Sequence, residues 1–220
     1  TAEMGDHAPG VTPPTGKVIF TSSMDDLFYS DLILIWGGNP NYTHIPNAHF
    51  IYEARYKGAH VVCIAPDFNP SSIHADEWVP VQIGTDAALA LSMAQVIVEE
   101  KLHKPEFLVE QTDMPLLVRL DDRRFLRASD LQPDGADDVF FVFDTVANRV
   151  VEAPRRNLQL GTITPALEGV FEVETREGMI RVTTVFEQLK AQLRDYTPEQ
   201  AEAITGVKAS QVRSLARRIA

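Results

Sequence analysis

The chain has 220 residues, of which 45% are hydrophobic and 23% are charged, and this composition indicates a folded protein rather than a disordered one. Thirty-one acidic residues against twenty basic residues give a formal net charge of −11, which disfavours binding to nucleic acid or to an anionic membrane surface. The longest apolar stretches, residues 32–36 and 87–94, are much shorter than the roughly 20 residues of a membrane-spanning helix, so we expect no direct membrane insertion.

A single cysteine, Cys63, cannot form an internal disulfide, a thiolate zinc site or an iron–sulfur cluster by itself. A metal in this protein must therefore use oxygen or nitrogen ligands, or arrive with a cofactor. Cys63 lies in an apolar run and is predicted to be a core residue. The chain opens at Thr1 without an initiator methionine or an apolar signal segment, so we expect an excerpt or a processed product.

The first half of the chain predicts alternating strands and helices. Residues 1–22 are rich in proline and glycine and predict an irregular loop, followed by a short helix that ends near Tyr29. The apolar runs 31–36 and 60–65 end in turns and predict strands buried on both faces. Further elements are a helix over 46–57, a strand over 78–81 and a helix over 87–102. This order predicts an α/β fold with a Rossmann-like parallel sheet and crossover helices.

The second half predicts an α+β insertion followed by helices. A helix is expected over 105–111, and two β-hairpins are expected, one from 139–143 with 149–152 and one from 170–175 with 179–183. Helical spacing returns over 185–193, 197–205 and 209–220. We therefore predict four segments: a loop (1–22), an α/β segment (23–115), a hairpin-containing α+β insertion (116–184) and a helical return to the α/β domain (185–220).

Polar residues follow each predicted strand, at the edge where open parallel sheets bind ligands. The candidate binding residues are Trp36, Gly37, Asn39, Pro66, Asp67, Gly84 and Asp86. Glycine after the first strand permits close backbone approach, and the Asp67 carboxylate suits the vicinal hydroxyls of a ribose. The Asp86 carboxylate can accept the N1–H and N2–H of guanine in a fork. Together these residues predict a guanosine nucleotide pocket.

Each of these residues also has a purely structural interpretation. Gly37 and Gly38 can form a simple turn, Asp67 an Asx-turn, and Asp86 a helix N-cap or first-turn residue. Neither G-x-G-x-x-G nor G-x-x-x-x-G-K-S/T occurs, which disfavours a dinucleotide dehydrogenase and a P-loop enzyme. Among the scattered histidines, His7 follows Asp6, and this pairing suits a metal or acid–base site.

Several motifs, taken in order and spacing, resemble the molybdopterin oxidoreductases of the dimethyl sulfoxide reductase superfamily. They are DLILIWGGNP (31–40), PNAHF (46–50), EARYKG (53–58), APD (65–67), HADEW (74–78), GTDAALAL (84–91), and in the tail YTPEQAEAITG (196–206) and SLAR (214–217). The resemblance is weakest between about 131 and 180. YKG (56–58), TDMP (112–115) and LRASDL (126–131) are similar to the type II branch, which includes nitrate, perchlorate and selenate reductases and dimethyl sulfide and ethylbenzene dehydrogenases.

The resemblance implies a molybdenum ion held by two molybdopterin guanine dinucleotides and by an aspartate about thirty residues before the W-G-x-N motif. Asp6 precedes Trp36 by 30 residues, so the resemblance makes Asp6 the catalytic residue and metal ligand, and makes 1–22 a metal-proximal loop. It makes the seven candidate residues contacts to one guanine dinucleotide within the α/β segment. The implied reaction is oxygen-atom transfer or hydroxylation, coupled to two-electron transfer in anaerobic respiration, on an oxyanion, dimethyl sulfide or a hydrocarbon.

The resemblance also implies parts that lie outside these residues. An upstream segment would hold an iron–sulfur cluster, and the partners would be an iron–sulfur beta subunit, with a haem or membrane-anchor subunit as a further possibility. The loop at 5–10 is nearer to the periplasmic members, which favours a periplasmic location. The isolated chain, as a fragment, is expected to bind no molybdenum cofactor stably and to be inactive.

The alternative is a freestanding α/β domain that binds a nucleotide or a protein without redox chemistry. An upstream Cys/His cluster would distinguish a molybdenum oxidoreductase from such a binding domain.

Overall fold

The computed structural model describes residues 24–154 and 160–220, which divide into two compact units. The first unit contains the described residues up to Leu89 and the returning segment Glu202–Gln211. The second unit contains Ala90–Ala201 and Val212–Arg218. No helix within the described ranges is long and apolar enough to cross a bilayer.

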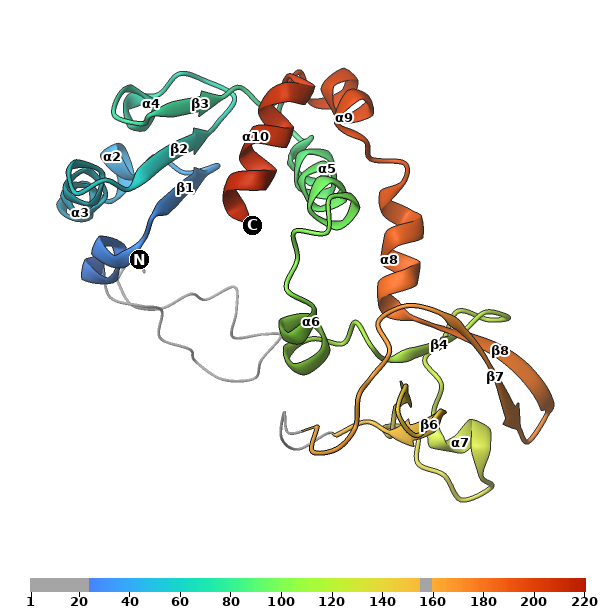
Figure 1. The fold of residues 1–220 in the computed structure, drawn as a ribbon. Helices are drawn as coiled ribbons and strands as arrows, with labels where there is room; N and C mark the ends of the chain where they lie inside the picture. The colour runs from blue at the N-terminus through green and yellow to red at the C-terminus, as the bar shows by residue number, and fades with distance from the viewer. Residues whose placement is uncertain (1–23, 155–159) are drawn as a thin grey trace. The chain divides into compact units, whose positions relative to one another are not determined.

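The first unit is built on a parallel sheet with the strand order β1-β2-β3 (Figure 1). Its strands are β1 (Leu32–Trp36), β2 (His60–Ile64) and β3 (Glu77–Val79). Its helices are the 3-10 helix η1 (Met24–Tyr29), α2 (Pro40–Thr43), α3 (Ile45–Tyr56), α4 (Pro70–Ile73) and the first residues of α5 (Asp86–Glu99). The predicted α/β class is confirmed, with α3 as the connection between the parallel strands β1 and β2.

One face of this sheet forms a core with α3. Ile33 and Ile35 from β1 pack with Cys63 from β2 and with Ile51 from α3. Cys63 has no exposed surface, as predicted for a core residue, and burial raises the pKa of its thiol. Side chains alternate between the faces of a strand, so every second residue of β1 and β2 lies on this face.

The prediction that both long strands are buried on both faces is correct for β2 and wrong for β1. Val62 and Ile64 of β2 are fully buried on the face away from α3. Leu32, Leu34 and Trp36 of β1, on that same face, are only half-buried. The sheet order explains the difference, because β2 is the central strand and β1 lies at an edge.

Asp76, which precedes β3, ties α3 to the sheet. Its carboxylate accepts hydrogen bonds from the Val61 backbone N–H at 2.9 Å and from Arg55 Nε at 2.7 Å. Burial raises the pKa of this carboxyl group, but the Val61 N–H and the Arg55 guanidinium lower it more, so the pKa lies below its ordinary value.

Replacing Asp76 by asparagine is expected to remove a pH-dependent part of the stability. The folded-state pKa lies below the unfolded value of about 4, so the carboxylate stabilises the fold above about pH 4, and this contribution is lost as the pH falls through the folded-state pKa. We expect Asp76→Asn to lower the free energy of unfolding by about 1 to 2 kcal/mol at neutral pH and by less near pH 3, measured by urea denaturation. Glu53→Gln, at an exposed position, is the control. An equal loss at both pH values would contradict the prediction.

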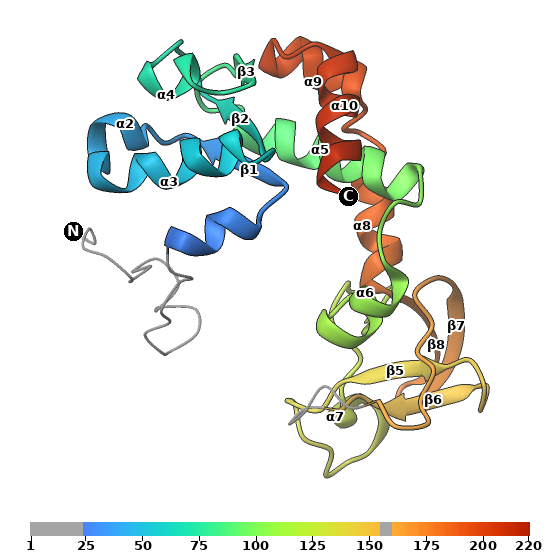
Figure 2. The same cartoon turned by 60° about the vertical axis from the view of Figure 1, so that its left-hand side comes forward.

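The second unit contains an antiparallel sheet and a separate hairpin (Figure 2). The sheet has the order β4-β8-β7, from β4 (Leu117–Arg119), β8 (Gly178–Thr184) and β7 (Val170–Thr175). The hairpin pairs β5 (Phe141–Asp144) with β6 (Arg149–Glu152). The helices that lie wholly in this unit are α6 (Pro105–Gln111), α7 (Ala128–Leu131) and α8 (Val185–Leu193), while α9 (Pro198–Thr205) and α10 (Ala209–Ile219) each have residues in both units. Both predicted hairpins are present.

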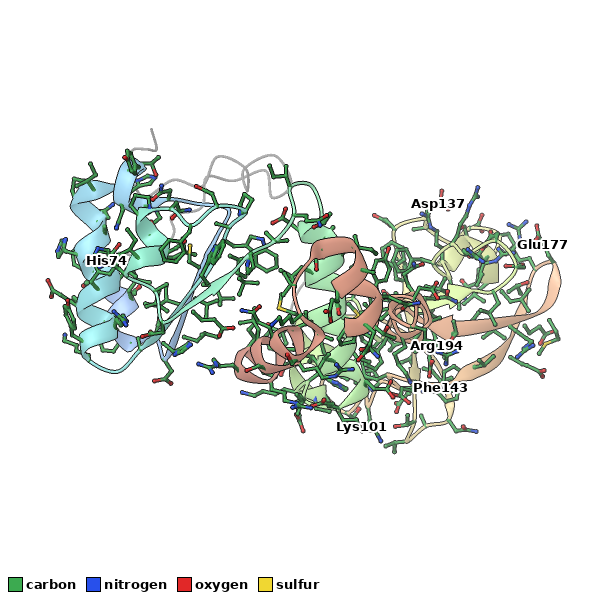
Figure 3. The ribbon with its side chains drawn as sticks, turned by 90° about the horizontal axis from the view of Figure 1, so that it is seen from above. His74, Lys101, Asp137, Phe143, Glu177 and Arg194 are labelled. Atoms are coloured by element: carbon green, nitrogen blue, oxygen red, sulfur yellow. The ribbon has the colours of Figure 1, made fainter. Side chains whose placement is uncertain are left out.

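Aromatic and aliphatic side chains join the sheet and the hairpin into one core. Leu117, Leu126 and Val182 are fully buried at its centre. Phe143 of β5, labelled in Figure 3, stacks on Phe171 of β7 with ring centroids 3.8 Å apart. Four short elements were not predicted: α2, α4, β4 and α7. Each has only three or four residues, which is too few for a period to be recognised.

Arg119 at the end of β4 is surrounded by carboxylates. Its guanidinium lies 2.7 Å from Asp130, 2.8 Å from Asp121 and 3.8 Å from Glu177, which occupies the turn between β7 and β8 (Figure 3). The Arg119 side chain is only 13% exposed. The hydrogen bonds from Arg119 lower the pKa of Asp121 to about 2.

Removing this guanidinium is expected to destabilise the second unit strongly. Arg119→Leu leaves neighbouring carboxylates, including the largely buried Asp130, without their counter-charge. We expect a loss of about 3 kcal/mol, measured as a lower denaturation midpoint. Arg124→Leu removes the same charge from a side chain that is 80% exposed and should change stability by less than about 0.5 kcal/mol. Similar losses for both variants would refute the prediction.

Candidate functional site

The loop after β1 turns sharply at Gly37. The Gly37 N–H donates to the Ile64 carbonyl at 3.0 Å, and its φ of 65° lies in the left-handed region that favours glycine. The next residues lead into α2, whose Tyr42 and Thr43 N–H groups donate to the Asn39 carbonyl. The Asn39 side-chain oxygen accepts a hydrogen bond from the Ser71 hydroxyl at 2.8 Å. Asn39 therefore binds to the segment that follows the neighbouring strand.

The loop after β2 is held by the cap of α4. Asn69 Oδ1 accepts hydrogen bonds from the Ser71 and Ser72 N–H groups at 3.0 and 3.2 Å. Asn69 and Ser71 are buried, so the Asn39–Ser71 bond fixes the two strand-end loops against each other. Neither Asn69 nor Ser71 was among the residues predicted for the site. Asn69 before Pro70 is the pattern of an N-cap followed by proline at the first helical position, and this pattern could have revealed them.

These two loops line an open cavity of about 220 Å³ at the carboxyl ends of β1 and β2. Its lining residues are Gly37, Gly38, Asn39, Ala65, Pro66, Asp67 and Asn69. The structure thus brings together four of the predicted binding residues: Gly37, Asn39, Pro66 and Asp67. A Cβ atom added at Gly37 or Gly38 would meet nothing within 4 Å, so the backbone there is open. Among the described residues, no hydrogen bond or ion pair engages the exposed Asp67 carboxylate.

The other three predicted residues meet around the start of α5. Gly84 has a φ of 82° and forms the turn before this helix, and Asp86 is its first residue. The Trp36 indole Nε1–H donates to Asp86 Oδ1 at 2.7 Å, so residues 50 positions apart are in direct contact. Trp36, Gly84 and Asp86 do not line the cavity described above.

The described part of the site offers groups that bind hydroxyl and amino groups. Carboxylates accept hydrogen bonds from hydroxyl and amino groups. Open glycine backbone permits close approach of the ligand that carries these groups. Within residues 24–154 and 160–220, no three His, Cys, Asp or Glu residues gather as a metal site. Asp6, the predicted metal ligand, lies outside the described residues.

A family profile described as molybdopterin oxidoreductase matches residues 2–191. The chain belongs to the molybdopterin oxidoreductase family. It is 49% identical to the chlorate reductase alpha subunit of Ideonella dechloratans over 98% of this chain and 24% of the relative. It is 43% identical to the dimethylsulfide dehydrogenase alpha subunit of Rhodovulum sulfidophilum, over 96% of this chain and 24% of the relative. It is 42% identical to the perchlorate reductase alpha subunit of Dechloromonas aromatica, over 98% of this chain and 26% of the relative.

These findings confirm the resemblance drawn from the sequence motifs. Membership in the molybdopterin oxidoreductase family implies a cofactor of molybdenum and molybdopterin. The chain spans about a quarter of the length of these relatives, which are alpha subunits.

Proposed function

We propose that this chain supplies the binding site for one molybdopterin guanine dinucleotide within the catalytic alpha subunit of a molybdenum oxidoreductase. The observation that carries the proposal is the gathering of open polar groups at one edge of a parallel sheet. The Asp67 carboxylate is exposed at the cavity and suits ribose hydroxyls. The open backbone at Gly37 and Gly38 permits close approach of a diphosphate or a pterin. These groups fit the nucleotide portion of such a cofactor.

The chain's residues in this proposal bind and orient rather than react. Asp86, at the first turn of α5, would accept hydrogen bonds from the N1–H and N2–H groups of guanine, and Asp67 would accept hydrogen bonds from the ribose hydroxyls. Asp6 is proposed as the protein ligand of molybdenum, because a carboxylate is a hard oxygen donor that suits a high oxidation state. When bound, the cofactor supplies oxygen-atom transfer or hydroxylation coupled to the movement of two electrons.

The names of the relatives support a further proposal on the substrate, and the motif resemblance is the basis for proposals on the partners and the location. Two relatives are named for the reduction of chlorate and perchlorate, and one is named for the oxidation of dimethyl sulfide. We propose a small oxyanion or sulfur compound as the substrate. An iron–sulfur cluster upstream and an iron–sulfur beta subunit would carry the electrons, and the periplasm is the proposed location.

The proposal is tested by measuring molybdenum and acid-released GMP in the full-length protein, purified from a host that makes the cofactor. The expected result is about two GMP per molybdenum, because each metal would be held by two guanine dinucleotides. A protein without molybdenum and GMP would refute the proposal. Molybdenum without GMP would refute the guanine dinucleotide.

A further inference from the structure

The hydrogen bond between Trp36 and Asp86 joins the carboxyl end of β1 to the start of α5. Trp36 is the last residue of β1, and Asp86 follows β3, while β2 lies between these two strands. Asp86 lies seven residues beyond the end of β3, and the loop between β3 and α5 brings its carboxylate within reach of the Trp36 indole. The 2.7 Å distance from Nε1 to Oδ1 is that of a charge-assisted hydrogen bond.

Asp86 does not serve its own helix as a cap. The N–H groups of Ala88 and Leu89 donate to the Thr85 carbonyl, and the Thr85 hydroxyl donates to the Gln82 carbonyl. In the described part of the chain, the indole of Trp36 is the hydrogen-bond partner of the Asp86 carboxylate. The capping interpretation of Asp86 therefore does not explain where its carboxylate points.

The indole leaves most of the carboxylate available. A carboxylate offers about four lone-pair sites, and one N–H occupies one of them. An indole N–H only donates and does not ionise near neutral pH, so it fixes the orientation of Asp86 without competing for protons. Oδ2 and the remaining site on Oδ1 can then accept two adjacent N–H groups, which is the pattern that guanine presents.

We infer that Trp36 is a positioning residue: its indole N–H holds the Asp86 carboxylate in the orientation that selects guanine over purines lacking the 2-amino group. The inference rests on the proposed guanine dinucleotide site and assigns its base selectivity to a residue of β1. Trp36 then acts through Asp86 rather than by contacting the nucleotide. Loss of the indole N–H should reduce the selectivity for guanine more than it reduces the stability of the fold.

The test compares GMP with IMP, which lacks the 2-amino group, binding to the cofactor-free full-length protein. Isothermal titration calorimetry of the wild type should give GMP binding about tenfold tighter than IMP binding, as one charge-assisted hydrogen bond predicts. Trp36→Phe should reduce this ratio to about two or less. Trp78→Phe is a matched control, because the Trp78 indole donates to the Ala65 carbonyl at 3.0 Å in the same sheet. It should keep the tenfold ratio.

Asp86→Asn separates the failure of this inference from the failure of the guanine site. If Asp86→Asn removes the preference for GMP and Trp36→Phe keeps it, the positioning role is overturned and the guanine site stands. If Asp86→Asn keeps the preference, or the wild type binds neither nucleotide, the guanine site and the inference both fail. If Trp36→Phe does not fold, benzothienylalanine at position 36, in which sulfur replaces the N–H, provides the same comparison with the ring size retained.

Discussion

A phenylalanine in place of Gly38 is expected to exclude the cofactor from the full-length protein while leaving the fold intact. Gly38 lines the cavity at the ends of β1 and β2, and a Cβ atom there meets nothing within 4 Å. Its φ lies outside the left-handed region, unlike that of Gly37, so a side chain at Gly38 adds no backbone strain. The phenyl ring would occupy the space proposed for the nucleotide. We expect the GMP and molybdenum contents to fall at least about tenfold.

Gly38→Ala is the control for the exclusion of the cofactor by the phenyl ring, because one methyl group fills little of a cavity of about 220 Å³. Its GMP content should stay near that of the wild type. Thermal unfolding of both cofactor-free variants should match the wild type within a few degrees, about the shift that 1 kcal/mol produces. A Gly38→Phe protein that retains its full complement of GMP would show that the dinucleotide lies elsewhere.

Asp6→Ala in the full-length protein is expected to abolish turnover, because it removes the proposed protein ligand of molybdenum. Hard anionic oxygen donors stabilise high metal oxidation states, and neither alanine nor a replacing water supplies that charge. Turnover should be measured with a reduced dye and chlorate, and with dimethyl sulfide and an oxidised dye, alongside the molybdenum content and circular dichroism.

Asp31→Ala is the matched control, since Asp31 is an exposed carboxylate at the start of β1 and at the opposite end of that strand from the site. Its turnover should equal that of the wild type. Unchanged turnover in Asp6→Ala would dismiss Asp6 as the ligand. Lost turnover with an altered circular dichroism spectrum would indicate a folding defect instead.

The sequence by itself determined the described strands other than β4, the long helices and both hairpins, because periodicity and turn residues act over a few neighbouring positions. It also located Gly37, Asn39, Pro66 and Asp67 together, since parallel strands place their carboxyl ends at the same edge of a sheet. These inferences need only local patterns and one rule of topology.

Only the tertiary structure decided which groups are bonded to one another. Strand β4 exists through its pairing with β8, where Leu117 faces Thr184. The half-exposure of β1 depends on its place at the sheet edge. The bond from Trp36 to Asp86 joins residues 50 positions apart. Such contacts depend on strand order and on the direction of side chains after packing, and neither leaves a pattern in neighbouring residues.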